Sequence, residues 1–182
     1  MSLPVSLPNI ITIARILLVP LTIWLMINHQ MLPAFAVFVI AGVSDAIDGW
    51  LARRFNMRTE LGAHLDPLAD KLLLISIFIT LTIMEHVFAW LTILVVTRDL
   101  LIVGGVLLAW VMGRPMRMRP VFTSKANTAA QIMFAGLMLL FLGLEWDTTW
   151  LIWVGSPVVA ALTLASGAIY LRDWLRHMAE ED

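Results

Sequence analysis

The chain has 182 residues, of which 60% are hydrophobic, 14% are charged and none is cysteine. A soluble domain usually carries about 25% charged residues, and the apolar residues here form long runs, so the composition favours a membrane protein over a soluble domain. The net charge of −1 indicates no nucleic-acid partner, and the absence of cysteine excludes disulfides.

Six segments are apolar enough to be membrane-spanning helices, which need roughly 20 such residues. In chain order they cover about residues 10–28, 34–54, 61–84, 87–112, 125–143 and 148–172. Backbone polar groups in lipid must be satisfied within the segment, so each run is predicted to be a helix. We therefore expect an all-α integral membrane protein, a single domain over residues 1–182 that forms a six-transmembrane-helix bundle.

Basic residues gather in alternate connections between these segments. Those that orient the bundle are Arg53, Arg54, Arg58, Arg114, Arg117, Arg119, Lys125, Arg172 and Arg176. The connections near residues 28–33, 85–86 and 144–149 carry no lysine or arginine. The positive-inside rule then predicts that both termini and the basic connections face the cytoplasm. Compact size and the lack of a targeting peptide favour a bacterial plasma membrane over the mitochondrial inner membrane.

Four aspartates lie in or beside the second and third segments, namely Asp45, Asp48, Asp66 and Asp70. A carboxylate at membrane depth is costly, which makes it a functional candidate. The first two are three residues apart and the last two are four apart, so each pair shares a helix face. The midpoint of Asp48 and Asp66 is residue 57, so a simple hairpin places both pairs at matching depth on the cytoplasmic side.

Four facing carboxylates repel one another unless some are protonated or cations neutralise them. Hard divalent cations prefer oxygen ligands, so Mg²⁺ or Mn²⁺ is the predicted partner. An alternative is structural ion pairing with Arg53, Arg54 and Lys71, although buried ion pairs are weak stabilisers. A divalent-cation transporter with an acidic intramembrane site is a further alternative of a different class.

The aspartates belong to a longer pattern, D-x2-D-G-x2-A-R-x8-G-x3-D-x3-D. Its eight positions are Asp45, Asp48, Gly49, Ala52, Arg53, Gly62, Asp66 and Asp70. The pattern resembles the signature of the CDP-alcohol phosphotransferases. That resemblance implies a commonly dimeric six-span bundle with a site open to the cytoplasmic leaflet and two divalent ions held by the four aspartates. It also implies that the CDP moiety binds near Asp48, Gly49, Ala52 and Arg53, and that Asp70 is the general base.

The segment Leu7–Arg15 resembles the first-helix start of phosphatidylglycerophosphate synthases and mitochondrial-type cardiolipin synthases. Asn9, Thr12 and Arg15 follow one another at one-turn spacing and could line the nucleotide end of the site together with Gly62. The alternative is an ordinary helix start with a snorkelling arginine.

The acceptor is indicated by the segment Pro120–Gln131, which resembles P-x-F-x-S-K-x-N-T-x-x-Q of the mitochondrial-type cardiolipin synthases. Phosphatidylglycerophosphate synthases tend to carry a second lysine at the position of Asn127. A second lysine suits the dianionic phosphate of glycerol 3-phosphate, whereas phosphatidylglycerol is a monoanionic diester. Ser124 and Lys125 begin a helix, where an anion is favoured, although Lys125 also fits a positive-inside anchor.

Arg98 either pairs structurally with Asp99 or reaches toward an anionic acceptor. The predicted function is transfer of a phosphatidyl group from CDP-diacylglycerol to phosphatidylglycerol, which yields cardiolipin and CMP. The alternatives are glycerol 3-phosphate as the acceptor and a catalytically silent member of the family, although the intact signature argues against silence.

Overall fold

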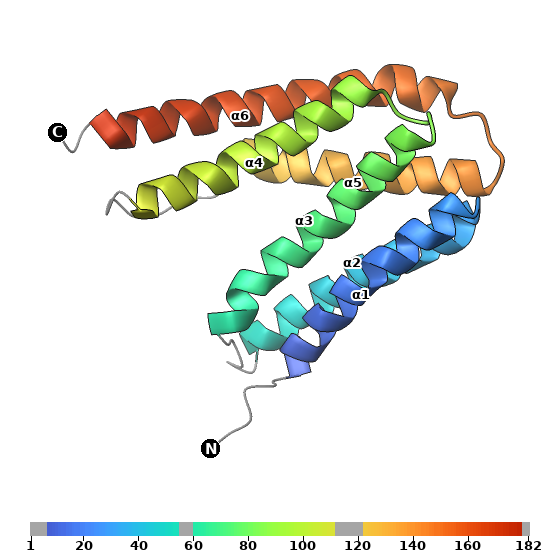
Figure 1. Ribbon diagram of the computed structural model, residues 1–182, viewed down its shortest axis with the longest axis horizontal. Coiled ribbons are helices and arrows are strands. Elements are labelled where there is room, and N and C mark those ends of the chain that lie inside the picture. The colour runs from blue at the N-terminus through green and yellow to red at the C-terminus, as the bar shows by residue number, and fades with distance from the viewer. Residues whose placement is uncertain (1–6, 55–59, 112–121, 180–182) are drawn as a thin grey trace. The chain divides into compact units, whose positions relative to one another are not determined.

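The computed structural model describes residues 7–54, 60–111 and 122–179, which form helices and contain no strand (Figure 1). The helices are α1 (Leu7–Ile27), α2 (Met31–Arg54), α3 (Glu60–Ile83), α4 (Ala89–Val111), α5 (Phe122–Gly143) and α6 (Ser156–Ala179), and a π-helical turn, η1 (Leu151–Gly155), precedes α6. Within these helices the structure does not describe the side chains of residues 7–14, 46, 48–54, 60–70, 106–107, 109–111 and 177–179. The first five helices match the predicted segments to within a few residues at each end. The last segment, predicted over residues 148–172, is divided into η1 and α6 and continues to Ala179.

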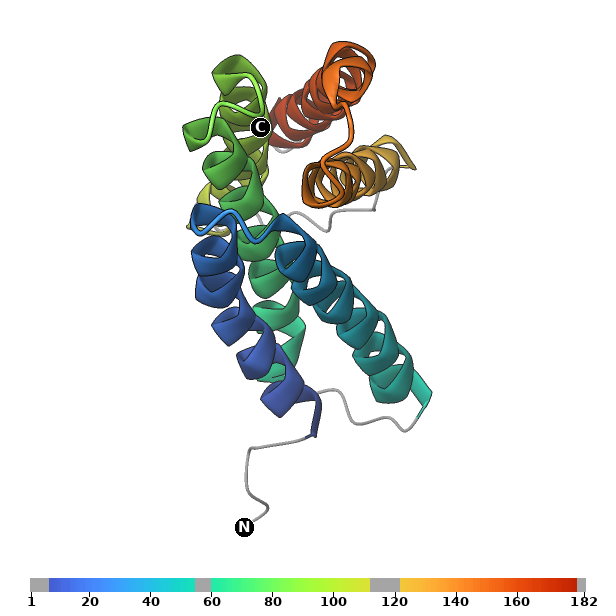
Figure 2. The same cartoon turned by 90° about the vertical axis from the view of Figure 1, so that its right-hand side faces the viewer.

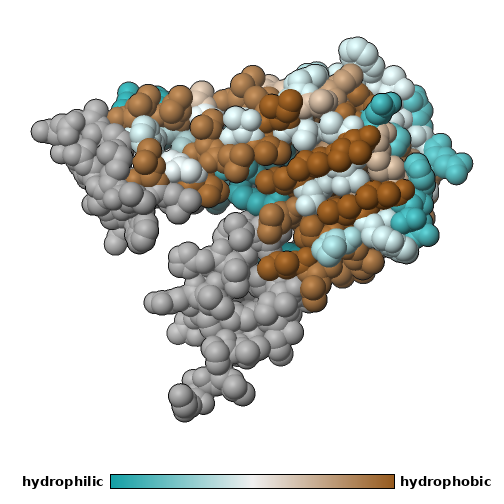
Figure 3. Space-filling view, in the orientation of Figure 1, coloured by the Kyte–Doolittle hydropathy of each residue, from teal (hydrophilic) through white to brown (hydrophobic). Residues whose placement is uncertain are grey.

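Two of the described helical stretches, Phe122–Gly143 and Leu151–Arg176, are long and apolar enough to cross a membrane. Three further stretches are apolar but shorter, at Arg15–Ile27, Met31–Asp45 and Lys71–Ile83. The sides of the helices are largely hydrophobic, and hydrophilic residues are concentrated at the turns (Figure 3). This distribution is that of an all-α membrane protein. The number of spans and the side of the termini stay predictions.

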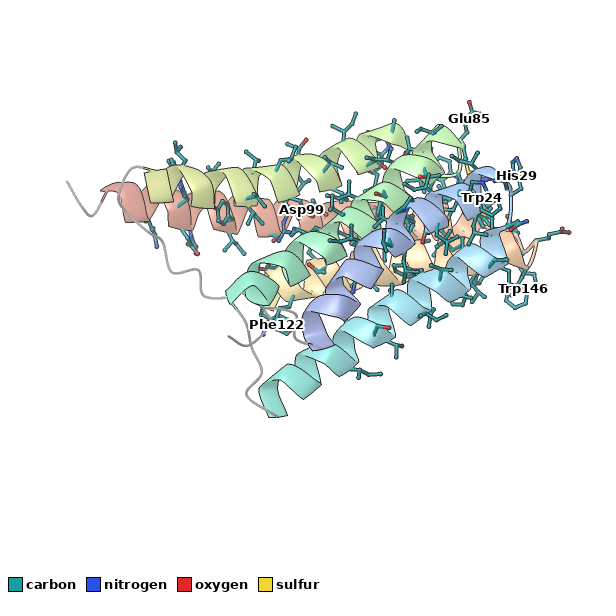
Figure 4. The ribbon with its side chains drawn as sticks, turned by 60° about the horizontal axis from the view of Figure 1, so that its bottom comes forward. Trp24, His29, Glu85, Asp99, Phe122 and Trp146 are labelled. Carbon is teal, nitrogen blue, oxygen red and sulfur yellow. The ribbon has the colours of Figure 1, made fainter. Side chains whose placement is uncertain are left out.

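Three turns that lack lysine and arginine each have a left-handed residue after a helix, namely His29, Glu85 and Glu145, with φ of 59°, 62° and 56°. At the last of them the Trp146 N–H donates to the Phe141 carbonyl at 2.8 Å, and the two rings pack edge to face at 5.1 Å. This is the Schellman arrangement, in which a left-handed residue closes the helix and an apolar contact covers it. Figure 4 shows His29, Glu85 and Trp146 at these turns.

The chain forms two compact units, and the first comprises Met1–Met84 and Ala135–Thr148. In this unit α1 packs against both α2 and α3. The end of α5 closes on the start of α2, because a Cβ atom added at Gly143 would lie 2.6 Å from the backbone nitrogen of Leu32. The first unit therefore holds the hairpin on which the acidic motif lies.

The second unit comprises Glu85–Phe134 and Thr149–Asp182, and in it α4 packs along α6 (Figure 2). The Tyr170 hydroxyl donates to the Ile102 carbonyl and the Trp174 indole N–H to the Gly105 carbonyl, each at 3.1 Å. Residue numbers increase together along this contact, so α4 and α6 run parallel. In a bundle whose successive helices run in opposite directions, helices two apart in the sequence, such as α4 and α6, run in the same direction.

Candidate functional site

The acidic motif lies on the last turns of α2 and the first turns of α3. Asp45 and Asp48 fall inside α2, and Asp66 and Asp70 fall inside α3. The predicted helical spacing within each pair is therefore confirmed for the backbone. Of these four aspartates, only Asp45 has a described side chain. Their convergence stays a prediction, and so do the predicted roles of side chains outside the described set, at Asn9, Thr12, Gly49, Ala52, Arg53 and Gly62.

Asp45 is held by an arginine from the neighbouring helix. The Arg15 Nη1 atom of α1 lies 2.9 Å from an Asp45 carboxylate oxygen, and the arginine side chain is 1% exposed while the aspartate is 38% exposed. Arg15 is therefore buried and not snorkelling, contrary to the alternative drawn from its position near a helix start. The Arg15 guanidinium group therefore contacts one carboxylate oxygen of Asp45, the first aspartate of the motif.

The donor set at this motif suits a hard divalent cation. A carboxylate presents two oxygens with about four lone-pair directions, so Asp45 keeps an oxygen for another partner while Arg15 holds the first. None of the eight fixed positions of the motif is histidine or cysteine, although His64 stands at a variable position. Oxygen ligands of this kind are those that Mg²⁺ prefers. Among the side chains that the structure describes, no group of three acidic, histidine or cysteine residues gathers elsewhere.

A second polar cluster surrounds Arg98 in the middle of α4. Its Nη1 atom donates to the Asp99 carboxylate at 2.7 Å, and both side chains are 5% exposed. Its Nη2 atom donates to the hydroxyls of Ser124 on α5 at 2.7 Å and of Ser166 on α6 at 2.6 Å. The predicted ion pair is thus present, and one guanidinium also ties three helices together. Figure 4 shows Asp99 midway along α4.

The Arg98 cluster retains donors for an anion. Ser124 and Ser166 accept from Arg98, and a hydroxyl that accepts a bond keeps its own proton to donate. The Arg98 Nε atom is buried and has no acceptor among the described residues. Ser124 and the exposed Lys125 lie in the first turn of α5, where backbone N–H groups and the helix dipole favour an anion. The arrangement can receive a phosphate group.

Asn127, on which the choice of acceptor depended, is fully buried between α5 and α6. Its Oδ1 atom accepts from the Thr163 hydroxyl at 2.9 Å, and the Gln131 amide donates to the same hydroxyl at 3.4 Å. Sequence reasoning did not single out Thr163 or Ser166. Their signal was present, because polar side chains within an apolar span commonly bond a neighbouring helix.

Comparisons with known proteins give a consistent result. Residues 5–164 match the sequence model of the family described as CDP-alcohol phosphatidyltransferase. A rice (Oryza sativa subsp. japonica) protein, "CDP-diacylglycerol--glycerol-3-phosphate 3-phosphatidyltransferase 1, chloroplastic", is 35% identical over 91% of this chain and 56% of its own length. The human "Cardiolipin synthase (CMP-forming)" is 32% identical over 75% of this chain and 50% of its own length.

A bacterial relative is matched over nearly its whole length. The Pseudomonas fluorescens "CDP-diacylglycerol--glycerol-3-phosphate 3-phosphatidyltransferase" is 34% identical over 95% of this chain and 92% of its own. The matches to the rice and human relatives, in contrast, span about half the length of those proteins. The names of these relatives describe two different activities, glycerol-3-phosphate 3-phosphatidyltransferase and cardiolipin synthase.

Proposed function

We propose that this chain, which belongs to the CDP-alcohol phosphatidyltransferase family, transfers a phosphatidyl group from CDP-diacylglycerol to an acceptor hydroxyl and releases CMP. The observation that carries the proposal is the complete acidic motif on two helices joined by a short connection. Asp45 and Asp48 lie in the C-terminal half of α2, which ends at Arg54, and Asp66 and Asp70 lie in the N-terminal half of α3, which begins at Glu60. Four carboxylates at one place can bind the divalent ions that hold a pyrophosphate. Structural ion pairs explain them less well, because buried ion pairs are weak stabilisers.

The four aspartates would hold two divalent ions, Mg²⁺ or Mn²⁺, which supply charge neutralisation at the pyrophosphate when bound. Arg15 would orient Asp45 through its ion pair. Asn9, Thr12, Gly49, Ala52, Arg53 and Gly62 would line the CDP moiety. Asp70 would accept the proton of the acceptor hydroxyl. The acceptor oxygen forms a bond to the lipid-side phosphorus as the bond from that phosphorus to the CMP oxygen breaks.

Phosphatidylglycerol is the acceptor that we propose, and cardiolipin the product. The charge of the Arg98 cluster supports this acceptor. Asp99 neutralises Arg98 on α4, and Lys125 is the one lysine or arginine of α5. Asn127 adds no charge, and it is buried against Thr163. Among the described residues of this cluster and the first turn of α5, one net positive charge remains, and it matches a monoanionic phosphodiester better than a dianionic phosphate monoester.

Glycerol 3-phosphate is the second candidate acceptor. The specific observation in its favour is the Pseudomonas fluorescens relative, whose name gives that acceptor and which is covered over 92% of its length. A divalent-cation transporter is the candidate from another class, and it would show ion flux that depends on the aspartates without CMP release. We further propose a homodimer in a bacterial plasma membrane with the site facing the cytoplasm, as the basic connections predict.

The test is CMP release by the purified chain with CDP-diacylglycerol and Mg²⁺. Phosphatidylglycerol and glycerol 3-phosphate are supplied in separate reactions. Asp70→Asn is expected to lower the rate by about 10²- to 10⁴-fold, the usual contribution of a general base. Asp173→Asn is the matched control, because that carboxylate lies at the surface beside Arg172.

Each outcome has a definite meaning. CMP release with phosphatidylglycerol that is lost in Asp70→Asn supports a cardiolipin synthase. CMP release with glycerol 3-phosphate alone supports phosphatidyl transfer but rules out phosphatidylglycerol as the acceptor. No release with these or other alcohols overturns the enzyme and leaves the transporter.

A further inference from the structure

Arg15 reaches the acidic motif from a helix that carries none of its four aspartates. That helix, α1, packs along both α2 and α3. Arg15 on α1 and Asp45 on α2 lie at similar distances from the turn that joins these helices, at residues 28–30, so antiparallel packing places them side by side. The helix that contacts both acid-bearing helices therefore supplies a cation to one of their carboxylates.

Burial fixes Arg15 in this position. Its side chain is 1% exposed and is the largest of the fully buried side chains among the described residues. Ala41, one turn before Asp45 on α2, is buried as well, so Asp45 continues the buried side of α2. A buried guanidinium group that loses its carboxylate is left as an uncompensated charge. We therefore expect the ion pair to persist when Asp45 binds a further ligand.

The ion pair makes the two oxygens of the Asp45 carboxylate unequal. One oxygen lies 2.9 Å from the Arg15 Nη1 atom, while the side chain as a whole is 38% exposed and open to a second partner. A divalent ion that bound both oxygens would be drawn toward the guanidinium group, and like charges at short range repel one another. An ion that binds only the far oxygen avoids much of this repulsion. Asp45 is therefore set to offer one oxygen and not two.

Divalent ions differ in how they use a carboxylate. Ca²⁺ takes about six to eight oxygen ligands and accepts both oxygens of one carboxylate, in a flexible geometry. Mg²⁺ requires a nearly ideal octahedron, is bound through few carboxylates and keeps several waters. Restriction of Asp45 to one oxygen thus removes a ligand that Ca²⁺ can use and removes nothing that Mg²⁺ needs.

We propose that Arg15 selects the metal ion: by holding one oxygen of Asp45 it confines that carboxylate to one-oxygen coordination and favours Mg²⁺ over Ca²⁺ at the acidic motif. The proposal rests on the proposed function, because it requires the motif to bind a divalent ion. Arg15 is a positioning residue in this scheme, since it acts on the ion through Asp45. The proposal also gives a reason for a buried cation beside a motif that binds cations.

The test measures metal affinity directly. Mn²⁺ bound to the purified chain in detergent is followed by electron paramagnetic resonance, with CDP-diacylglycerol present and no acceptor alcohol, and Mg²⁺ or Ca²⁺ is titrated to displace it. The ratio of Ca²⁺ affinity to Mg²⁺ affinity is compared among the wild type, Arg15→Met and Arg15→Lys. Arg172→Met is the matched control, because Arg172 pairs with Asp173 at the same 2.9 Å but at the surface.

We expect Arg15→Met to raise this ratio about tenfold, the lower end of the usual effect when a residue that holds a metal ligand is replaced. Arg15→Lys keeps the charge and should stay near the wild type, and Arg172→Met should equal it. Thermal unfolding in detergent checks that each variant folds. If Arg15→Met does not fold, Arg15→Gln, which keeps an N–H donor but no charge, takes its place with the same expected rise.

Other results overturn the proposal in distinguishable ways. An unchanged ratio in Arg15→Met, or an equal loss of affinity for both ions, shows that Arg15 does not select the ion and leaves the proposed function in place. A rise in Arg15→Lys as large as that in Arg15→Met excludes the charge of residue 15 as the cause. A wild-type chain that binds no Mn²⁺ overturns the proposal together with the metal site, and CMP release measured in a separate reaction then shows whether phosphatidyl transfer itself stands.

Discussion

Two arginines lie within apolar helices, and each is buried against a carboxylate. Arg15 is 1% exposed beside Asp45, and Arg98 is 5% exposed beside Asp99. A charge in such surroundings persists only when it is paired and hydrogen-bonded. Asp45 is 38% exposed, so its pair with Arg15 leaves the carboxylate open on one side. We therefore predict that Arg15 orients the Asp45 carboxylate for a ligand.

We predict that Arg15→Met lowers CMP release by about 10- to 100-fold, the usual effect of losing a group that orients a metal ligand. Arg172→Met is the control, since the Arg172–Asp173 pair is 59% and 36% exposed and such pairs contribute little. The Mg²⁺ concentration for half-maximal rate is measured for both. Equal behaviour of the two variants would show that Arg15 is only structural.

Glycines decide how closely the helices approach. Gly143 ends α5 against the backbone of Leu32, where an added Cβ atom would lie 2.6 Å from nitrogen and 2.8 Å from Cα. Gly42 lies inside α2, and an added Cβ atom there would meet nothing within 4 Å. The same residue type thus has a packing role at one site and none at the other.

Gly143→Ala is therefore expected to destabilise the chain by about 1–3 kcal/mol, because backbone must move to admit the methyl group. Gly42→Ala is expected to stabilise it by up to about 1 kcal/mol, the helix propensity gained at an uncrowded site. Thermal unfolding in detergent compares the two variants. A Gly143→Ala chain as stable as the wild type would mean that α5 and α2 do not approach as closely as described.

At the scale of the whole molecule, the turns divide into two classes. Those at His29, Glu85 and Glu145 are short, carry no lysine or arginine and have a left-handed residue after a helix. The ends that carry arginine include Arg176 at the end of α6. The positive-inside rule assigns the two classes to opposite sides of the membrane.

The chain contains no cysteine, so single-cysteine variants can be labelled without background. We predict that a membrane-impermeant maleimide labels His29→Cys, Glu85→Cys and Glu145→Cys in intact spheroplasts. Arg176→Cys should be labelled only after the membrane is opened. Labelling of all four variants from outside would contradict the six-span topology.

The sequence by itself determined the extent of the helices and the spacing of the acidic motif. Both depend on neighbours along the chain: apolar run length, turn residues and the helical period. The tertiary structure decided that Arg15 holds Asp45, that Arg98 bonds Ser124 and Ser166, and that Asn127 is buried against Thr163. These contacts join different helices. The sequence contains many polar residues that could pair with one another, and only the packing of the helices determines which of them are adjacent.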